Sequence, residues 1–214
     1  MKGAKYKVYE EPYRLNIVGI RNAETQPNKF DDSMVVFWKN DQGDWEEKTY
    51  PVTTDTGTYW LLNPMSNQGT AMLKEGQYVD AYAQGYHRGE YKALTQQKPV
   101  TVYRDYDRNA LFDIFTKTET GNFGINIHKA GENSQNVDKW SAGCQVFQRT
   151  DDFNDFMGLT NKHRDRYGNS FTYTLIDERA IRRRKRIVAF FVSIGAFIAV
   201  GVTVGLYLRN KNKN

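Results

Sequence analysis

The segment from Ile187 to Leu208 contains 22 residues and no charged side chain. As a helix rising about 1.5 Å per residue, it would span about 33 Å, which matches the hydrocarbon core of a bilayer. A buried helix of a globular domain is normally shorter and has a polar face, which this segment lacks. We therefore expect one transmembrane helix here, with the folded domain before it. Gly201 and Gly205 form a G-x-x-x-G pair, so a helix-mediated homodimer is a further hypothesis.

Charges on either side of this segment predict its orientation. Five basic residues, 182–186, precede it, and Arg209, Lys211 and Lys213 follow it. The more basic flank tends to stay in the cytoplasm, which would place the large N-terminal domain inside. The first residues contain no apolar stretch of the kind found in a cleaved secretory signal. The expected location is a membrane, with a single C-terminal anchor, and the side on which the domain lies stays open.

These features divide the chain into five parts. They are an N-terminal strand or extension (1–29), the main folded domain, which is the candidate catalytic domain (30–180), a basic juxtamembrane segment (181–186), the transmembrane helix (187–208) and a short polar tail (209–214). Eight of the 30 Lys and Arg residues follow residue 181, and none of the 25 Asp and Glu residues does. The first 181 residues therefore carry 22 basic and 25 acidic side chains. A nucleic-acid-binding protein concentrates basic charge on its folded domain, so this distribution argues against nucleic acid as a partner.

The first 180 residues are rich in aromatic and β-branched side chains, with turn signals at short intervals. This pattern predicts a mainly β, α+β domain. Strands are expected at 14–20, 34–38, 45–52, 58–62, 70–73, 100–103, 123–128, 143–147 and 171–176. The turn at 40–44 predicts a hairpin between the second and third of these.

One helix is expected over residues 150–166, because apolar side chains recur there at helical spacing. Thr150 or Asp151 is the candidate N-cap. His163 lies among Lys and Arg residues on this helix, and we expect it at the surface.

Cys144 is the only cysteine, which excludes an internal disulfide framework. It follows His128 by sixteen residues, in the sequence Trp-Ser-Ala-Gly-Cys-Gln-Val-Phe. A thiol is nucleophilic as the thiolate, so at neutral pH it needs a neighbouring base or a positive field. Folding that brings the His128 imidazole within hydrogen-bonding reach of the sulfur would supply that base. The small residues Ala142 and Gly143 would let a substrate carbonyl approach the backbone N–H groups. A lone cysteine is also often a small buried hydrophobe, and the spacing leaves both interpretations open.

A second set of polar residues has the spacing of an oxygen-rich cation loop. Asp105, Asp107 and Asn109 stand at alternating positions and Asp113 follows, a D-x-D-x-N…D spacing that partly resembles a calcium loop. Ala110 occupies the position where such loops usually have glycine, and no Glu stands at the terminal position. An Asp- and Asn-rich turn between strands is the alternative, so the sequence does not decide whether these residues bind calcium.

The residues around the cysteine resemble the signature of the YkuD-type L,D-transpeptidases, in which a His precedes a Ser/Thr-x-Gly-Cys motif. Here the corresponding residues are His128 and Ser141-Ala142-Gly143-Cys144. The hairpin at 34–52 and the following Pro51-Val-Thr-Thr-Asp-Thr-Gly57 are similar to the strand pair and turn of that family. The resemblance covers about residues 30–148. It implies a β-sandwich or barrel-like catalytic domain with the cysteine facing a cleft.

The resemblance also implies a reaction and roles for particular residues. Cys144 would attack a carbonyl of a peptidoglycan stem peptide, between a diamino acid and a D-amino acid, and His128 would act as general base. Backbone N–H groups of Cys144 and Gly143 would hold the oxyanion, and Ser141 would orient His128 or a substrate carboxylate. Asn126, Ala142, Gln145 and His87 are the candidate substrate-binding residues. His87 is expected in a turn. No metal and no organic cofactor is implied.

The chain departs from that family at two positions. Ala142 stands where the family often has His, and Val146 stands where it often has Arg or Asn. Attack on an amide is therefore more firmly implied than transfer to an amine. Hydrolysis by an L,D-carboxypeptidase or endopeptidase, including a role in phage lysis, stays an alternative. So does a cell-wall-binding or virion structural domain without catalysis. Peptidoglycan lies outside the cytoplasmic membrane, so the predicted orientation conflicts with the substrate unless the membrane is breached first.

Overall fold

The computed structural model describes residues 6–23, 27–111, 113–132 and 134–183. The chain divides into two units, residues 1–177 and 178–214, and the described part of the second unit, residues 178–183, is helical. Across the described residues, no helix combines the length and the apolar composition that crossing a membrane requires. The expected transmembrane segment at 187–208, its glycine pair and the polar tail at 209–214 all lie outside the described residues.

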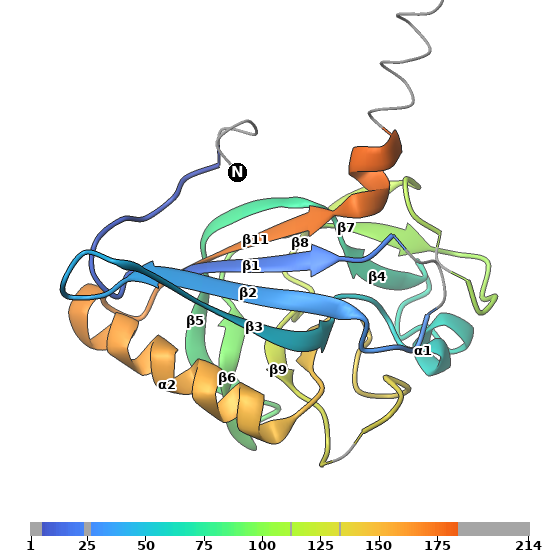
Figure 1. Cartoon of the computed structure of the whole chain (residues 1–214). Helices are drawn as coiled ribbons and strands as arrows, with labels where there is room; N and C mark the ends of the chain where they lie inside the picture. Colours follow the sequence, from blue (N-terminus) through green and yellow to red (C-terminus); the bar gives the residue numbers. More distant parts are fainter. Residues whose placement is uncertain (1–5, 24–26, 112, 133, 184–214) are drawn as a thin grey trace, which may run out of the picture. The chain divides into compact units, whose positions relative to one another are not determined.

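The first unit is mainly β, as predicted, and its principal feature is a closed barrel (Figure 1). Within the described residues the strand order around the barrel is β1-β11-β5-β6-β9-β10-β3-β2. The strands are β1 (Asn16–Arg21), β2 (Asp32–Lys39), β3 (Trp45–Thr53), β5 (Gly76–His87), β6 (Tyr91–Gln96), β9 (Ile127–Lys129), β10 (Gln145–Phe147) and β11 (Phe171–Asp177). β1 pairs with β11, and β9 with β10, in parallel, whereas the other pairs are antiparallel. Because β1 is a barrel strand, residues 16–21 belong to the domain and not to a separate extension.

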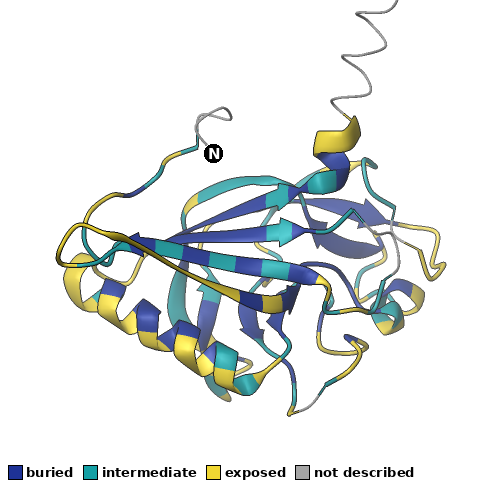
Figure 2. Ribbon diagram, in the orientation of Figure 1, coloured by how far each residue is buried: buried dark blue, intermediate teal, exposed yellow. Residues whose placement is uncertain are grey.

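The predicted hairpin at 34–52 forms β2 and β3. Buried and half-buried residues alternate along β2, from Asp32 to Lys39, because successive side chains point to opposite faces of the sheet (Figure 2). The turn between the strands is closed by Asn40, whose side-chain oxygen accepts the N–H groups of Gln42 and Asp44. Gly43 has a φ of 90°, a conformation that favours glycine. Local turn chemistry and alternation therefore agree here, which explains why the sequence predicted this element well.

A second, smaller sheet has the order β4-β7-β8, with β4 at Thr70–Leu73, β7 at Val100–Asp105 and β8 at Thr118–Gly121. The prediction of a strand at 58–62 is wrong, because these residues form the short helix α1, Thr58–Leu62. Only Leu61 of this helix is buried. Its aromatic residues, Tyr59 and Trp60, have a high β propensity, but propensity alone does not form a strand where no neighbouring strand pairs with it.

Helix α2, Thr150–Tyr167, packs along the barrel with one buried face (Figures 1 and 2). Phe153 and Phe156 contact Phe147 of β10. The residue at the N-cap is Arg149, without a side-chain cap, so neither Thr150 nor Asp151 has the predicted role. The expectation that His163 lies at the surface is also wrong. Its ring is buried, and its Nδ1 accepts the N–H of Leu15 at 3.0 Å, which is possible only because the histidine is neutral.

Arg21 forms a buried charged centre that the sequence did not reveal. Its guanidinium is fully buried and pairs with Asp55 at 2.8 Å and with Asp177 at 3.2 Å. It also donates to the Thr54 hydroxyl and carbonyl and to the carbonyl of Leu73. These contacts connect β1 and β11 to the segment that follows β3 and to β4. They fix the position of the chain just before α1.

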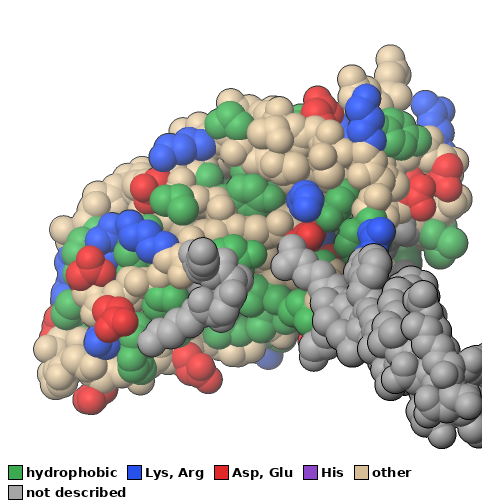
Figure 3. All heavy atoms as spheres, turned by 90° about the horizontal axis from the view of Figure 1, so that it is seen from above, with side chains coloured by type: hydrophobic (Ala, Val, Ile, Leu, Met, Phe, Trp, Pro, Cys, Tyr) green, Lys and Arg blue, Asp and Glu red, His purple; other side chains and the backbone are tan. Residues whose placement is uncertain are grey.

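Figure 3 shows one face of the molecule from above, with basic, acidic and hydrophobic side chains interspersed. Among the described residues, no continuous basic stripe is visible on this face.

Candidate active site

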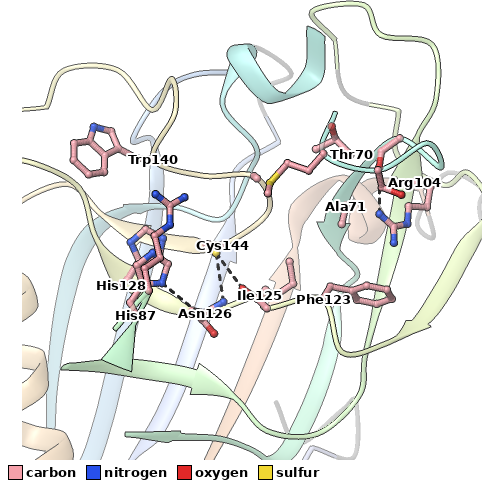
Figure 4. A pocket seen from close by; sticks show the side chains of 16 residues that line it. Thr70, Ala71, His87, Arg104, Phe123, Ile125, Asn126, His128, Trp140 and Cys144 are labelled. Atoms are coloured by element: carbon pink, nitrogen blue, oxygen red, sulfur yellow. Dashed lines mark hydrogen bonds between the residues drawn. The ribbon is translucent and has the colours of Figure 1, made fainter. Parts of the chain in front are cut away.

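Cys144 and His128 line the same cavity, which has a volume of about 370 Å³ (Figure 4). The cavity lies where the barrel meets the small sheet, and strand β4 and the residues before β9 and β10 form its walls. Its other lining residues are Met65, Ser66, Gly69, Thr70, Ala71, His87, Arg88, Arg104, Phe123, Gly124, Ile125, Asn126, Trp140 and Ala142. In Figure 4 the two imidazoles lie on one side of Cys144, and Phe123 and Arg104 lie on the other.

The register of two parallel strands places the nucleophile and the base near each other. β10 begins one residue after Cys144, and His128 is the middle residue of β9. Gln145 is opposite Ile127 and Val146 is opposite His128. The N–H of Gln145 donates to the Asn126 carbonyl at 2.9 Å, which fixes this register next to the cysteine.

The loop before Cys144 is held by two contacts with distant parts of the chain. The N–H of Gly57 donates to the Ser141 carbonyl at 2.9 Å, and a Cβ on Gly57 would meet the Asp138 carbonyl oxygen at 1.9 Å. Only glycine therefore allows these backbones to approach so closely. The side chain of Asn28 accepts the N–H of Asp138 and donates to its carboxylate. Gly57, which follows β3, and Asn28, which precedes β2, thus position the loop that carries the cysteine.

Ser141 and Gly143 shape the turn that carries the cysteine. The Ser141 hydroxyl donates to the Cys144 carbonyl at 2.8 Å and accepts the N–H of Gly143 at 3.2 Å. Gly143 has a φ of 119°, and a Cβ there would meet the Ala71 carbonyl oxygen at 2.3 Å. Ser141 is buried and contacts neither His128 nor the cavity, in contrast to its expected orienting function. The Gly143 N–H is already bonded, which leaves Cys144 as the remaining oxyanion donor of the two expected.

The sulfur of Cys144 is half-buried and has two backbone contacts. It accepts the N–H of Asn126 at 3.4 Å and donates to the Gly124 carbonyl at 3.5 Å. Burial raises the pKa of the thiol to about 11, although the Asn126 N–H and the charge of Arg88 oppose this effect. The resting side chain is therefore a thiol that needs a base at the moment of attack.

His128 has the tautomer that a general base requires. Its Nδ1 lies 2.8 Å from the Lys129 carbonyl, and because a carbonyl only accepts, Nδ1 carries the proton. Nε2 consequently presents a lone pair, and it is buried without a hydrogen-bond partner among the described residues. Burial, together with His87, lowers the pKa of His128 to about 3, so the ring is neutral at physiological pH. Tyr91, whose hydroxyl donates to the same carbonyl, supports the ring from outside the cavity.

The expected hydrogen bond between Cys144 and His128 is not formed in this structure. In the described part of the chain the sulfur contacts only backbone groups, and Nε2 stays unpaired. The thiol proton is directed towards Gly124, so rotation of the side chain must precede proton transfer to His128. Contacts of this kind are often long without substrate and shorten when substrate binds.

His87 and Asn126 support the base and also line the cavity. The rings of His87 and His128 are stacked, with centroids 4.0 Å apart. The side-chain Nδ2 of Asn126 donates to His87 Nδ1 at 3.2 Å, and the side-chain Oδ1 of Asn126 accepts the N–H of Gln96 at 2.9 Å. Burial and Arg88 lower the pKa of His87, which keeps the stacked pair neutral. The prediction that His87 lies in a turn is wrong, because His87 is the last residue of β5.

Gln145 does not line the cavity, although the sequence made it a candidate substrate-binding residue. It is fully buried, its side-chain Oε1 accepts the Tyr173 hydroxyl at 2.8 Å, and its side-chain Nε2 donates to the Gly143 carbonyl. Ala142 does line the cavity.

Charge in the cavity is entirely positive among the described residues. Its lining includes Arg88 and Arg104 and neither Asp nor Glu. Arg104 is neutralised by Glu119 at 2.7 Å. Arg88 is exposed in the turn after β5 and forms no ion pair with any residue that the structure describes. Neither Arg88 nor Tyr91 was predicted from the sequence as a site residue. Each acts across a strand pairing, β5 with β6 or β6 with β9, that the sequence pattern did not indicate.

Comparison with protein-family models, with curated proteins and with solved structures finds no match for this chain. The resemblance to YkuD-type L,D-transpeptidases therefore depends on the quoted residues alone.

Proposed function

We propose that the protein is a cysteine-dependent acyl-transfer enzyme that acts on peptidoglycan stem peptides in the manner of L,D-transpeptidases. The observation that carries the proposal is the unpaired, buried Nε2 of neutral His128 in the same cavity as the only thiol. A buried nitrogen without a partner is costly, and a catalytic role is one explanation for such a cost. The arrangement has the elements of a nucleophile–base pair.

In the proposed reaction, the Cys144 thiol rotates from Gly124 towards His128 and gives its proton to Nε2. The sulfur attacks the peptide carbonyl, and the resulting oxyanion accepts the N–H of Cys144. Breakage of the C–N bond leaves a thioester, and His128 returns the proton to the departing amine. An acceptor amine or water then attacks the thioester, loses a proton to His128, and releases the sulfur as a thiol.

Arg88 fits the charge of this substrate class. Stem peptides carry free carboxylates, and this exposed guanidinium is the cavity's cation without an ion-pair partner among the described residues. We propose that Arg88 binds a substrate carboxylate, in the place of the polar residue that Val146 replaces in the motif. A guanidinium binds carboxylates through paired hydrogen bonds, which suits this function.

Two further features of the proposed reaction are the group that attacks the thioester and the place in the cell where the enzyme meets its substrate. Transpeptidation requires an amine to enter the cavity, whereas hydrolysis by a carboxypeptidase or endopeptidase, as in phage lysis, requires only water. The apolar segment 187–208 would anchor the enzyme in a membrane, and the side on which the domain lies would decide when it meets its substrate.

The direct test incubates the full chain, in detergent, with disaccharide tetrapeptides and analyses the products by mass spectrometry. Loss of the terminal D-residue indicates a carboxypeptidase, and a cross-linked dimer indicates a transpeptidase. A carbapenem should form a thioester at Cys144, which the mass of the intact protein reports. Cys144→Ala should abolish both reactions, with unchanged thermal unfolding as the control for folding. Absence of turnover and of the adduct in the natural chain would refute the enzymatic proposal.

A non-catalytic wall-binding domain is the second candidate, because the raised pKa of Cys144 and its missing contact with His128 are also properties of an inert thiol. Sedimentation with purified cell wall separates the two. A binding domain would sediment equally with and without Cys144→Ala and would show no turnover in either form.

A further inference from the structure

Three carboxylates gather at the end of strand β7 in the small sheet. Asp105 is the last residue of β7, and Asp107 and Asp113 lie in the connection to β8. One carboxylate oxygen from each lies within 4.8 Å of the others. Such an arrangement of like charges is unfavourable by itself, and exposed acidic residues alone would not indicate a ligand.

Asp105 provides the independent observation. Only 4% of its surface is exposed, and both of its carboxylate oxygens are buried without a hydrogen-bond partner among the described residues. Burying a carboxylate in this way is costly unless a cation or donors compensate it. Asp32 is a useful contrast within the same domain, because this equally buried carboxylate accepts the N–H groups of Asn22 and Thr54. Burial raises the pKa of Asp105 to about 6, and Asp107 and Asp113 contribute to that increase.

The connecting loop holds the three carboxylates together through local contacts. Asn109 donates from its backbone and its side chain to the Asp107 carboxylate, and its own oxygen accepts the N–H of Leu111. The Thr116 hydroxyl donates to the Arg104 carbonyl at 2.9 Å, which closes the loop back onto β7. The loop therefore brings the carboxylates of Asp105, Asp107 and Asp113 together. The spacing of residues 105, 107 and 109 is the one that oxygen-rich cation loops use.

We propose that Asp105, Asp107 and Asp113 form a binding site for a divalent cation, with Ca²⁺ as the preferred ion. An all-oxygen ligand set selects hard cations and disfavours zinc or copper, which prefer nitrogen and sulfur. Ca²⁺ accepts six to eight oxygens in adaptable geometry, which suits carboxylates on an irregular loop. Mg²⁺ requires a near-ideal octahedron and releases its water reluctantly, so it would bind more weakly here.

The site lies behind one wall of the Cys144 cavity. Asp105 is opposite Thr70 in the β4–β7 register, and a Cβ on Gly69 would meet the Asp105 carbonyl oxygen at 1.6 Å. Gly69, Thr70 and Arg104 all line the cavity. A cation bound by Asp105 would therefore stabilise the strand ends that form this wall. The cation would act at a distance from the sulfur, so thiol chemistry and cation binding can be tested separately.

The test measures thermal unfolding of the full chain in detergent with EDTA, CaCl₂ or MgCl₂, together with calorimetric titration of CaCl₂ alone. At Ca²⁺ a hundredfold above its dissociation constant, the midpoint should rise by about 5–10 °C over EDTA. Mg²⁺ at the same concentration should give a smaller rise. Titration should show one site per chain.

Asp105→Asn separates a cation site from a merely acidic cluster. It removes a buried, uncompensated charge, so its midpoint in EDTA should equal or exceed that of the natural chain, while its response to Ca²⁺ should be lost. Asp113→Asn should weaken binding at least tenfold. Asp44→Asn, in the exposed β2–β3 turn, is the control and should respond as the natural chain does. Absence of any Ca²⁺ response in the natural chain, or an equal response in Asp105→Asn, would overturn the proposal.

Discussion

The Arg21 centre and the Cys144 cavity both contain buried polar groups near the small sheet, but the hydrogen-bonding capacity of these groups is satisfied to different degrees. All the nitrogens of Arg21 find carboxylates, carbonyls or a hydroxyl. In the cavity, Nε2 of His128 has no partner among the described residues, and the thiol has only long backbone contacts. A satisfied buried network contributes to a unique fold, whereas an unsatisfied one costs stability and leaves groups available for a ligand. The contrast therefore separates residues that maintain the structure from residues that carry out the proposed reaction.

The largest expected effect follows from removing the unsatisfied nitrogen. His128→Gln can retain a donor towards the Lys129 carbonyl but cannot act as a base. We expect kcat to fall by about 10²–10⁴-fold on stem peptides, with little change in the midpoint of thermal unfolding. Steady-state kinetics and differential scanning fluorimetry measure the two quantities. A large loss of stability with retained activity would reverse the assignment.

Removing the charge of Arg21, whose hydrogen bonds are all made, should lower the stability of the fold by more than removing His128 does. Arg21→Met removes the buried guanidinium that pairs with Asp55 and Asp177, which is expected to lower the free energy of unfolding by about 3–5 kcal/mol. Arg166→Met removes the exposed pair with Asp41 and the contact of the guanidinium with the Tyr13 ring, and should cost about 1 kcal/mol. Urea unfolding followed by tryptophan fluorescence gives both values. Equal effects in the two variants would show that burial does not distinguish these ion pairs.

A smaller effect is expected at the edge of the cavity. Arg88→Gln removes the positive charge proposed to hold a substrate carboxylate, and we expect KM to rise about tenfold, equivalent to about 1.4 kcal/mol, with kcat nearly unchanged. An amidated stem peptide should bind both forms equally. If the natural enzyme does not distinguish carboxylate from amide, Arg88 has another function.

The smallest expected effect is the absence of a pH dependence. The pKa of His128 is lowered to about 3, so the base stays unprotonated throughout the range from pH 5 to pH 8. Protonation of this imidazole should therefore not reduce kcat/KM as the pH falls through 6.5, the usual histidine pKa. A profile of kcat/KM against pH provides the test. A decrease centred near pH 6.5 would mean that the imidazole is solvated in the working enzyme.

Local patterns predicted the elements whose cause is local. The β2–β3 hairpin follows from alternation and from the turn residues Asn40 and Gly43, β4 was predicted at its observed bounds, and α2 follows from apolar spacing. The α1 residues have β propensity but no strand to pair with, and the basic neighbours of His163 concealed its buried position. β5 and β6 were not predicted, because buried and half-buried residues do not alternate along them. β8 was not predicted either, because it is only four residues long and none of them is a large apolar residue.

Much of the candidate site could be predicted, because its motif is contiguous from Ser141 to Cys144. The sequence could not show that Ser141 and Gln145 turn away from the cavity, since this depends on the sharp turn at Gly143. The stacking of His87 on His128 depends on contacts between strands distant in sequence. Arg21 gave no signal either, because a single arginine in a strand does not reveal which carboxylates will surround it.

The parallel pairing of β9 with β10 has a consequence for evolution. Backbone hydrogen bonds, and not chain length, set the relative positions of His128 and Cys144. Insertions or deletions in the excursion between residues 131 and 137 would leave the two side chains in place. Related proteins can therefore differ widely in the interval between these two residues, and a search that allows a variable gap should find homologues that a fixed spacing would miss.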